Sequence, residues 1–238
     1  MLSRRDFVAF ATSLAVAPRA LWAALDVPSL LDHILLGCSN LEQGVAFVEQ
    51  RTGIKAAFGG VHPGRGTQNA LLSLVEPRYL EIIAPDPAQA RVEPRAQAQV
   101  TRLKSLAAPR LIGWAVHPGK LESLAHKLQD AGILAVGPTP GSRQRSDGRL
   151  LKWQALNLSS DRKGILPFFI EWSSDSVHPS IDSPAGCRLE RFSITTPDVR
   201  ELSAVFRKLG VEVEIEAGRM PELRARISSP RETFELTS

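Results

Sequence analysis

Three segments of this chain follow the same order of secondary structure. Each begins with a short apolar strand, continues into a helix that ends before a glycine, and later reaches a strand with one glutamate among apolar residues. The glycines are Gly53, Gly132 and Gly210, which lie 79 and 78 residues apart. A repeat of this length is too long for a solenoid and is typical of duplicated domains.

Apolar residues at intervals of three and four indicate one helix in each segment. These helices cover residues 41–52, 121–131 and 199–209. The glycine after each favours a left-handed residue at the helix end, and short alternating or wholly apolar runs predict the strands. We therefore expect an α+β fold of repeated βαβββ modules. They cover residues 30–85 and 110–175, with a helix near residues 96–106 between them and a third, partial module within residues 184–238.

Several short motifs are similar to the sequence pattern of a known family. They are Leu31-Asp32-His33, the loop from His62 to Leu71, the strand from Leu80 to Pro85, Ser142-Arg143-Gln144-Arg145 and the run from Leu166 to Trp172. Together they resemble the glyoxalase-like domain family of the vicinal oxygen chelate superfamily, over nearly the whole chain after residue 23. The resemblance implies that the two modules within residues 24–183 pair into a half-open barrel, whose concave face holds a metal or a small ligand. The third module is expected to lie outside that site.

The resemblance also implies metal ligands from the first and last strands of the paired modules. Transferred to this chain, they are His33, Glu81 and Glu171, whereas Gly113 takes the fourth position and has no donor atom. One histidine with two carboxylates fits an open catalytic site for a divalent ion, whose identity the sequence does not name. Glu81 or Glu171 would also act as the catalytic base. The alternative is a metal-free barrel in which these residues are hydrogen-bonded structural groups.

Two loops add basic side chains next to strands that should line the barrel. Arg65 lies in the first loop, and Arg143 and Arg145 lie in the second. Arginine holds a carboxylate or phosphate through two parallel hydrogen bonds, so these residues indicate a small anionic substrate. Asn69 and Trp153 are candidates for the same binding surface. Solvated loops without a ligand and tryptophans in the core are the alternatives.

The amino terminus indicates export. Ser3-Arg4-Arg5-Asp6-Phe7 precedes an apolar run and a small-residue end, and this order resembles a twin-arginine signal peptide. We expect cleavage after Ala23, so that residues 1–23 are the signal and the protein is periplasmic or secreted. The apolar run is too short to form a stable membrane span. An uncleaved leader that anchors the protein, or a segment that never leaves the cytoplasm, is left open.

Charge and cysteine content restrict the partners. The formal net charge of +4 falls to +2 without residues 1–23, which contain three Arg and one Asp. So weak a positive bias argues against a nucleic-acid partner. Cys38 and Cys187 could form a disulfide in an oxidising compartment or stay buried thiols. The sequence leaves a homodimer open.

These observations predict an exported glyoxalase-like protein that binds a small anionic molecule and acts on it as a divalent-metal-dependent isomerase or lyase. The main alternative is a metal-free protein of the same superfamily that binds or sequesters a small molecule. A third is a pseudo-enzyme whose third module serves an interaction.

Overall fold

Two paired modules form one curled sheet in the computed structural model, which describes residues 26–75, 77–145 and 147–238. The first module contains β1 (Leu31–Gly37), α1 (Leu41–Thr52), β2 (Ala57–His62), β3 (Thr67–Ser73) and β4 (Tyr79–Pro85). The second contains β5 (Arg110–Val116), α3 (Leu121–Asp130), β6 (Ala135–Gln144), β7 (Leu150–Leu158) and β8 (Phe168–Trp172). The predicted signal at residues 1–23 lies outside the described residues.

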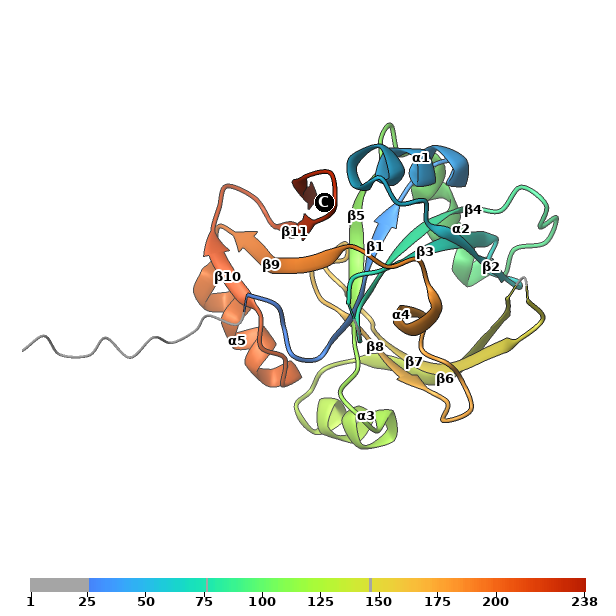
Figure 1. The fold of residues 1–238 in the computed structure, drawn as a ribbon. Coiled ribbons are helices and arrows are strands. Elements are labelled where there is room, and N and C mark those ends of the chain that lie inside the picture. Colours follow the sequence, from blue (N-terminus) through green and yellow to red (C-terminus); the bar gives the residue numbers. More distant parts are fainter. Residues whose placement is uncertain (1–25, 76, 146) are drawn as a thin grey trace, which may run out of the picture.

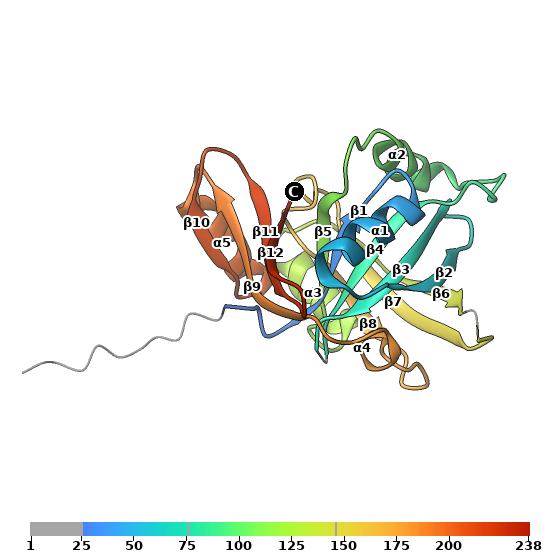
Figure 2. The ribbon, with the colours of Figure 1, turned by 45° about the horizontal axis from the view of Figure 1, so that its top comes forward.

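The strand order confirms the predicted pairing of βαβββ modules. The eight strands follow the order β2-β3-β4-β1-β5-β8-β7-β6, and the two modules meet where β1 and β5 pair antiparallel (Figure 1). The free edges β2 and β6 approach each other, because the Arg143 guanidinium on β6 donates to the Gly59 carbonyl on β2. The sheet therefore curls into a half-barrel, and we call its concave side the cup (Figure 2).

Local sequence accounts for the helix ends. The Asn40 side chain accepts a hydrogen bond from the Gln43 amide at 3.0 Å and caps the start of α1. Gly53 ends α1 in the left-handed region with a φ of 75°. The helix expected near residues 96–106 is α2 (Pro94–Lys104), whose Leu103 packs with Ile83 and Ile112 on the concave side. This helix therefore covers one end of the cup.

The last segment forms a separate, smaller sheet. After the short α4 (Pro179–Asp182) come β9 (Arg188–Thr196), α5 (Val199–Leu209), β10 (Glu214–Ala217), β11 (Glu222–Ser228) and β12 (Thr233–Thr237). The elements follow one another as in the first two modules, but the strand order is β10-β9-β11-β12. In the paired modules the second strand lies at the far edge, whereas β10 pairs directly with β9 in parallel.

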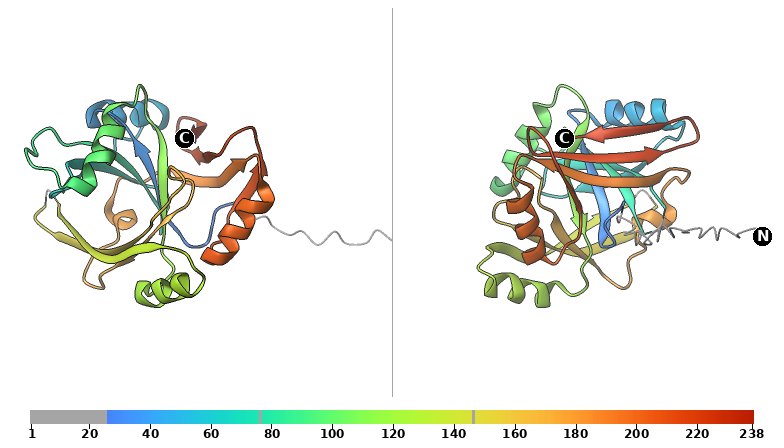
Figure 3. Two further views of the ribbon diagram at one scale, coloured as in Figure 1. Left: turned by 180° about the vertical axis from the view of Figure 1, so that it is seen from behind. Right: turned by 90° about the vertical axis from the view of Figure 1, so that its left-hand side faces the viewer.

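The smaller sheet packs beside β5, outside the cup (Figure 3). Trp114 on β5 is fully buried, and its ring lies 4.8 Å from the ring of Phe192 on β9 and 6.0 Å from that of Phe206 on α5. These aromatic side chains belong to one apolar core that runs through both sheets.

Cys38 and Cys187 are both buried free thiols. Within the described ranges, no helix is long and apolar enough to cross a membrane.

Candidate functional site

The cup contains a cavity of about 680 Å³ that opens to solvent. Polar and charged side chains lie on its wall between apolar ones. Those used below are His33, His62, Arg65, Asn69, Tyr79, Glu81, Arg143, Trp153 and Trp172.

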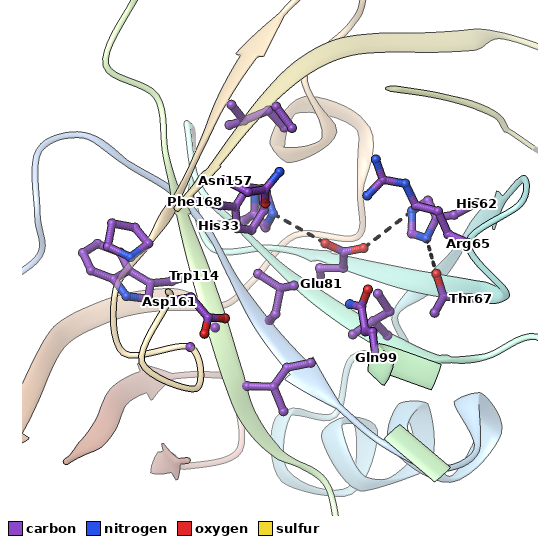
Figure 4. A pocket seen from close by; sticks show the side chains of 18 of the residues that line it. His33, His62, Arg65, Thr67, Glu81, Gln99, Trp114, Asn157, Asp161 and Phe168 are labelled. Carbon is purple, nitrogen blue, oxygen red and sulfur yellow. Dashed lines mark hydrogen bonds and ion pairs between the residues drawn. The ribbon is translucent and has the colours of Figure 1, made fainter. Parts of the chain in front are cut away.

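Glu81 is the central charged group of the cavity wall. It is 7% exposed, and its Oε2 lies 3.5 Å from Nε2 of His33, while its Oε1 lies 3.8 Å from Nε2 of His62. Asn69 donates to Oε1 at 2.7 Å. Figure 4 shows the carboxylate between the two imidazoles, which approach it from opposite sides.

Strand pairing brings these residues together. In the parallel ladder of β1 and β4, His33 pairs with Tyr79 and Leu35 pairs with Glu81. Alternation along β4 places both Tyr79 and Glu81 on the cavity face. The Tyr79 ring stacks on the His33 imidazole at 4.5 Å, with an angle of 22° between the planes. Tyr79 therefore fixes one face of the imidazole that reaches Glu81.

The electrostatics keep Glu81 ionised and His62 neutral near neutral pH. Burial raises the pKa of Glu81, but the adjacent His33 and His62 imidazoles, the Asn69 hydrogen bond and the Arg143 guanidinium outweigh it, and the net pKa lies below the usual value. Burial lowers the pKa of His62 to about 4, with a smaller contribution of the same sign from Arg143. His62 therefore serves as a neutral hydrogen-bonding group, whose Nδ1 lies 2.9 Å from Oγ1 of Thr67.

Several polar groups of the cavity lack either a counter-ion or a hydrogen-bond partner among the described residues. Arg143 is 3% exposed, and no described carboxylate lies within ion-pair distance of its guanidinium or that of Arg65. The buried Oδ1 of Asn69 also has no hydrogen-bond partner within the described ranges. A buried cation without a counter-ion is costly. The cavity is therefore suited to an anionic ligand with additional hydrogen-bonding groups.

The structure brings together most of the residues that the sequence singled out. Six of them line the cavity, and they are His33, Arg65, Asn69, Glu81, Arg143 and Trp153. Trp153 and Trp172 form part of the wall, with ring centroids 5.6 Å apart. Gly113 also lines the cavity, and it pairs with Leu35 rather than directly with His33, which pairs with Ala115.

Glu171 does not reach the cup, so the expectation that it would be a metal ligand and a base is corrected. The residues of β8 that line the cavity are Phe168, Ile170 and Trp172, and alternation turns Glu171 to the opposite face. There it accepts hydrogen bonds from Nζ of Lys120 at 2.6 Å and from the Leu121 amide at 2.9 Å, at the start of α3. Its carboxylate is thus an acceptor for a helix terminus.

Arg145 is likewise outside the cavity. It lies one residue beyond the end of β6, in the turn before β7, where acidic side chains surround it. Its guanidinium binds Asp182 of α4 at 2.7 Å and Asp147 at 3.4 Å. These local ion pairs replace the substrate contact that the sequence predicted.

His62, Tyr79 and Asp32 are site residues that sequence reasoning did not select. His62 and Asp32 stand inside the motifs that resemble the family, but no pattern marks His62 as a neighbour of Glu81 or Asp32 as a partner of His33. His62 comes from the edge strand β2, and only the curl of the sheet turns it toward β4.

The donor set does not form the expected metal site. Of the four ligand positions, the first module fills two, with His33 and Glu81. The second module fills neither, because Gly113 has no donor atom and Glu171 lies on the face of β8 opposite the cavity. Over residues 26–75, 77–145 and 147–238, no three His, Cys, Asp or Glu side chains are arranged to hold a metal ion. His62 does not complete a set, because it meets Glu81 from the side opposite His33.

Paired βαβββ modules curled around a polar cavity define a protein of the vicinal oxygen chelate type. The chain belongs to the glyoxalase-like domain family, whose pattern matches residues 31–223. Members of the superfamily often bind divalent metals. No protein among the curated sequences matches this chain.

Solved structures with the same fold have low sequence identity. A hypothetical protein from Staphylococcus aureus is similar with a TM-score of 0.60 and 16% identity, over 86% of this chain and 84% of that one. Methylmalonyl-CoA epimerase from Mycobacterium tuberculosis gives a TM-score of 0.44 and 17% identity, over 61% of this chain and 89% of that one. The Streptomyces coelicolor epimerase with bound 2-nitronate-propionyl-CoA gives 0.44 and 19%, over 60% and 97%. The first likeness supports the fold alone.

Proposed function

We propose that this protein binds a small carboxylate in the cup and moves a proton on the carbon next to the bound acid group, as an isomerase or lyase. The observation that supports this most directly is Glu81, a buried carboxylate on the cavity wall between two imidazoles. A base must lie within reach of the proton that it abstracts, and Glu81 is a buried carboxylate that lines the same cavity as Arg143.

Arg143 is the proposed anchor of the substrate. Its guanidinium lines the cavity and makes one hydrogen bond among the described residues, to Gly59, so most of its donors are available to a carboxylate. Charge complementarity would hold the acid group beside Glu81. Glu81 would then accept a proton from the substrate carbon, and the His33 imidazole would stabilise or share that proton.

The test uses a panel of small carboxylates that carry a hydrogen on the carbon next to the acid group, such as 2-hydroxy carboxylates. We expect at least one to raise the melting temperature of the protein, Arg143→Met to abolish that shift and Arg145→Met to retain it. In deuterated water, a bound compound should lose its carbon-bound proton, and Glu81→Gln should stop this exchange while the compound still binds. Binding without exchange in the native protein would instead support the sequestering alternative. The proposal would be refuted if no compound binds, or if the Arg143→Met variant binds as well as the native protein.

A divalent-metal-dependent form of this function is the second candidate. It is favoured by His33 and Glu81, which match two of the four ligand positions of the superfamily and lie 3.5 Å apart. An ion would polarise a substrate oxygen. The exchange assay with chelator-treated protein, with and without added divalent ions, separates the two candidates, because activity restored only by an ion would support the metal-dependent form.

We also propose that the protein is exported through residues 1–23, because Arg4 and Arg5 precede an apolar run. Secreted material should have the mass of a chain that begins near Ala24. Replacing both arginines with lysine should block export, and a full-length cytoplasmic product in the native host would contradict this proposal.

A further inference from the structure

Asp32 occupies an irregular position in β1. In the pairing of β1 with β5, Leu31 is opposite Val116 and His33 is opposite Ala115, so the ladder skips Asp32. A bulge of this kind redirects a side chain, and bulges are frequent next to active sites. Here it allows the side chains of two consecutive strand residues to meet, because Oδ1 of Asp32 lies 2.6 Å from Nδ1 of His33.

The second oxygen of Asp32 is held by other elements. Trp172 at the end of β8 donates to Oδ2 at 3.0 Å, and Nε2 of His178 lies 3.1 Å from the same atom. The Ser180 amide donates to Nδ1 of His178, so a neutral His178 carries its proton on Nε2 and donates it to Asp32. His117 is a further neighbour, with Nδ1 at 3.9 Å from Oδ2. Asp32 is 2% exposed.

These contacts stabilise an ionised Asp32. Nitrogen atoms of His33, Trp172 and His178 lie 2.6, 3.0 and 3.1 Å from the two Asp32 oxygens, and the Trp172 nitrogen can only donate. An ionised carboxylate accepts hydrogen bonds only, so the bond to His33 requires a proton on Nδ1. Nε2 of His33 is then the atom that exchanges a proton at the cavity.

We propose that Asp32 is a positioning residue that fixes the proton of His33 on Nδ1 and aims Nε2 at Glu81, and that His178 holds Asp32 in place. This inference rests on the proposed function, because it explains how His33 is kept ready to share a proton there. Without Asp32, a neutral His33 would favour a proton on Nε2, since the remaining acceptor is the Glu81 carboxylate 3.5 Å away. The segment between β8 and β9, which contains His178, thus supports the cup from outside.

The test reads the protonation of His33 directly, without a ligand. In the ¹⁵N-labelled full chain at about pH 9, well above the usual histidine pKa of about 6.5, proton–nitrogen correlation spectra should show Nδ1 of His33 protonated. Asp32→Asn should move the proton to Nε2. His178→Phe should speed exchange of the Nδ1 proton with solvent several-fold, whereas His178→Gln, which keeps an N–H donor, should retain the native rate. His126→Gln on the exposed face of α3 is the matched control and should change nothing.

Two results would overturn the inference. One is an unprotonated Nδ1 in the native protein, and the other is an Asp32→Asn variant that keeps its Nδ1 proton with the native exchange rate. If Asp32→Asn does not fold, the native spectrum and the two His178 variants decide. Because no ligand is used, failure of the carboxylate assay leaves this result intact. If the carboxylate assay shows exchange of the ligand's carbon-bound hydrogen, Asp32→Asn should slow that exchange. The affinity for the carboxylate, which depends on Arg143, should stay unchanged.

Discussion

At the scale of single residues, the neutral state of His62 makes the stability of the protein depend on pH. Its pKa is lowered to about 4 by burial, whereas an unfolded chain has the usual value of about 6.5. Between these values the unfolded state binds more protons. The stability that neutral His62 contributes is therefore complete above about pH 6.5 and is lost as the pH falls toward 4, by up to about 1.4 kcal/mol per pH unit.

We expect His62→Gln to reduce this loss. Urea denaturation between about pH 6.5 and 4.5 should show a flatter decline for the variant, because carboxylates contribute little until the pH falls below about 4.5. Near pH 7 the variant should be somewhat less stable, since the hydrogen-bonded contact with Thr67 changes. Parallel declines for the two proteins would contradict a neutral, buried His62.

Replacement by alanine should affect stability very differently at two glycines near the cavity. Gly164 has a φ of 93°, and a Cβ there would lie 2.0 Å from the Ile112 carbonyl oxygen, so Gly164→Ala should cost about 3 kcal/mol. Gly113 has no atom within 4 Å of an added Cβ, and Gly113→Ala should change stability by about 0.5 kcal/mol or less. Urea denaturation of both variants checks this. Equal losses would show that the space beside Gly113 is filled.

At the scale of elements, β8 has separate roles on its two faces. One face supplies Phe168, Ile170 and Trp172 to the cavity, and the other presents Glu171 to the start of α3. A carboxylate that accepts from amides in the first helical turn acts as a cap and favours the positive end of the helix dipole. The outer face of β8 therefore determines the position of α3 rather than chemistry in the cup.

We expect Glu171→Ala to lower stability by about 1 kcal/mol, because the Leu121 amide loses its acceptor. Carboxylate binding and proton exchange should be unaffected, in contrast to Glu81→Gln. Lys120→Ala, which removes only the exposed partner of Glu171, should have the smaller effect on stability. Loss of proton exchange in a stable Glu171→Ala protein would contradict this and show that Glu171 takes part in catalysis.

At the scale of the whole molecule, the C-terminal sheet is part of the same core as the half-barrel. Trp114 of β5 packs against Phe192 and Phe206, and the apolar cluster is continuous between the two sheets. The bidentate contact of Arg162 with Glu201 of α5 further connects the loop before β8 to this sheet. The two sheets should therefore unfold together.

We expect Phe192→Ala to destabilise the protein by about 3 to 5 kcal/mol, because a large side chain is removed from a fully buried position. Tryptophan fluorescence and far-ultraviolet circular dichroism should report one shared transition in the native protein. Met220→Ala, at a site that is 65% exposed in the same segment, is the control and should be nearly neutral. Two separate transitions would show that the C-terminal sheet folds independently.

The sequence by itself determined the elements and the module pairing. Apolar periodicity and capping residues such as Asn40 and Gly53 act within one helical turn, so they are readable without the fold. Strand alternation likewise places His33 on one face with Leu35, and Glu81 on one face with Ile83, and all four residues line the cavity.

Only the tertiary structure decided which groups meet. Each face of β8 carries apolar side chains, so alternation could not tell which one turns toward the cup, and the face that carries Glu171 turns away from it. His62 and Arg143 stand on edge strands that are far apart in the sheet order, and the curl of the sheet brings them to Glu81. The C-terminal sheet packs against Trp114 and β5, and its strand order differs from that of the paired modules. Each of these outcomes rests on contacts between distant segments, whose energies no local pattern of residues records.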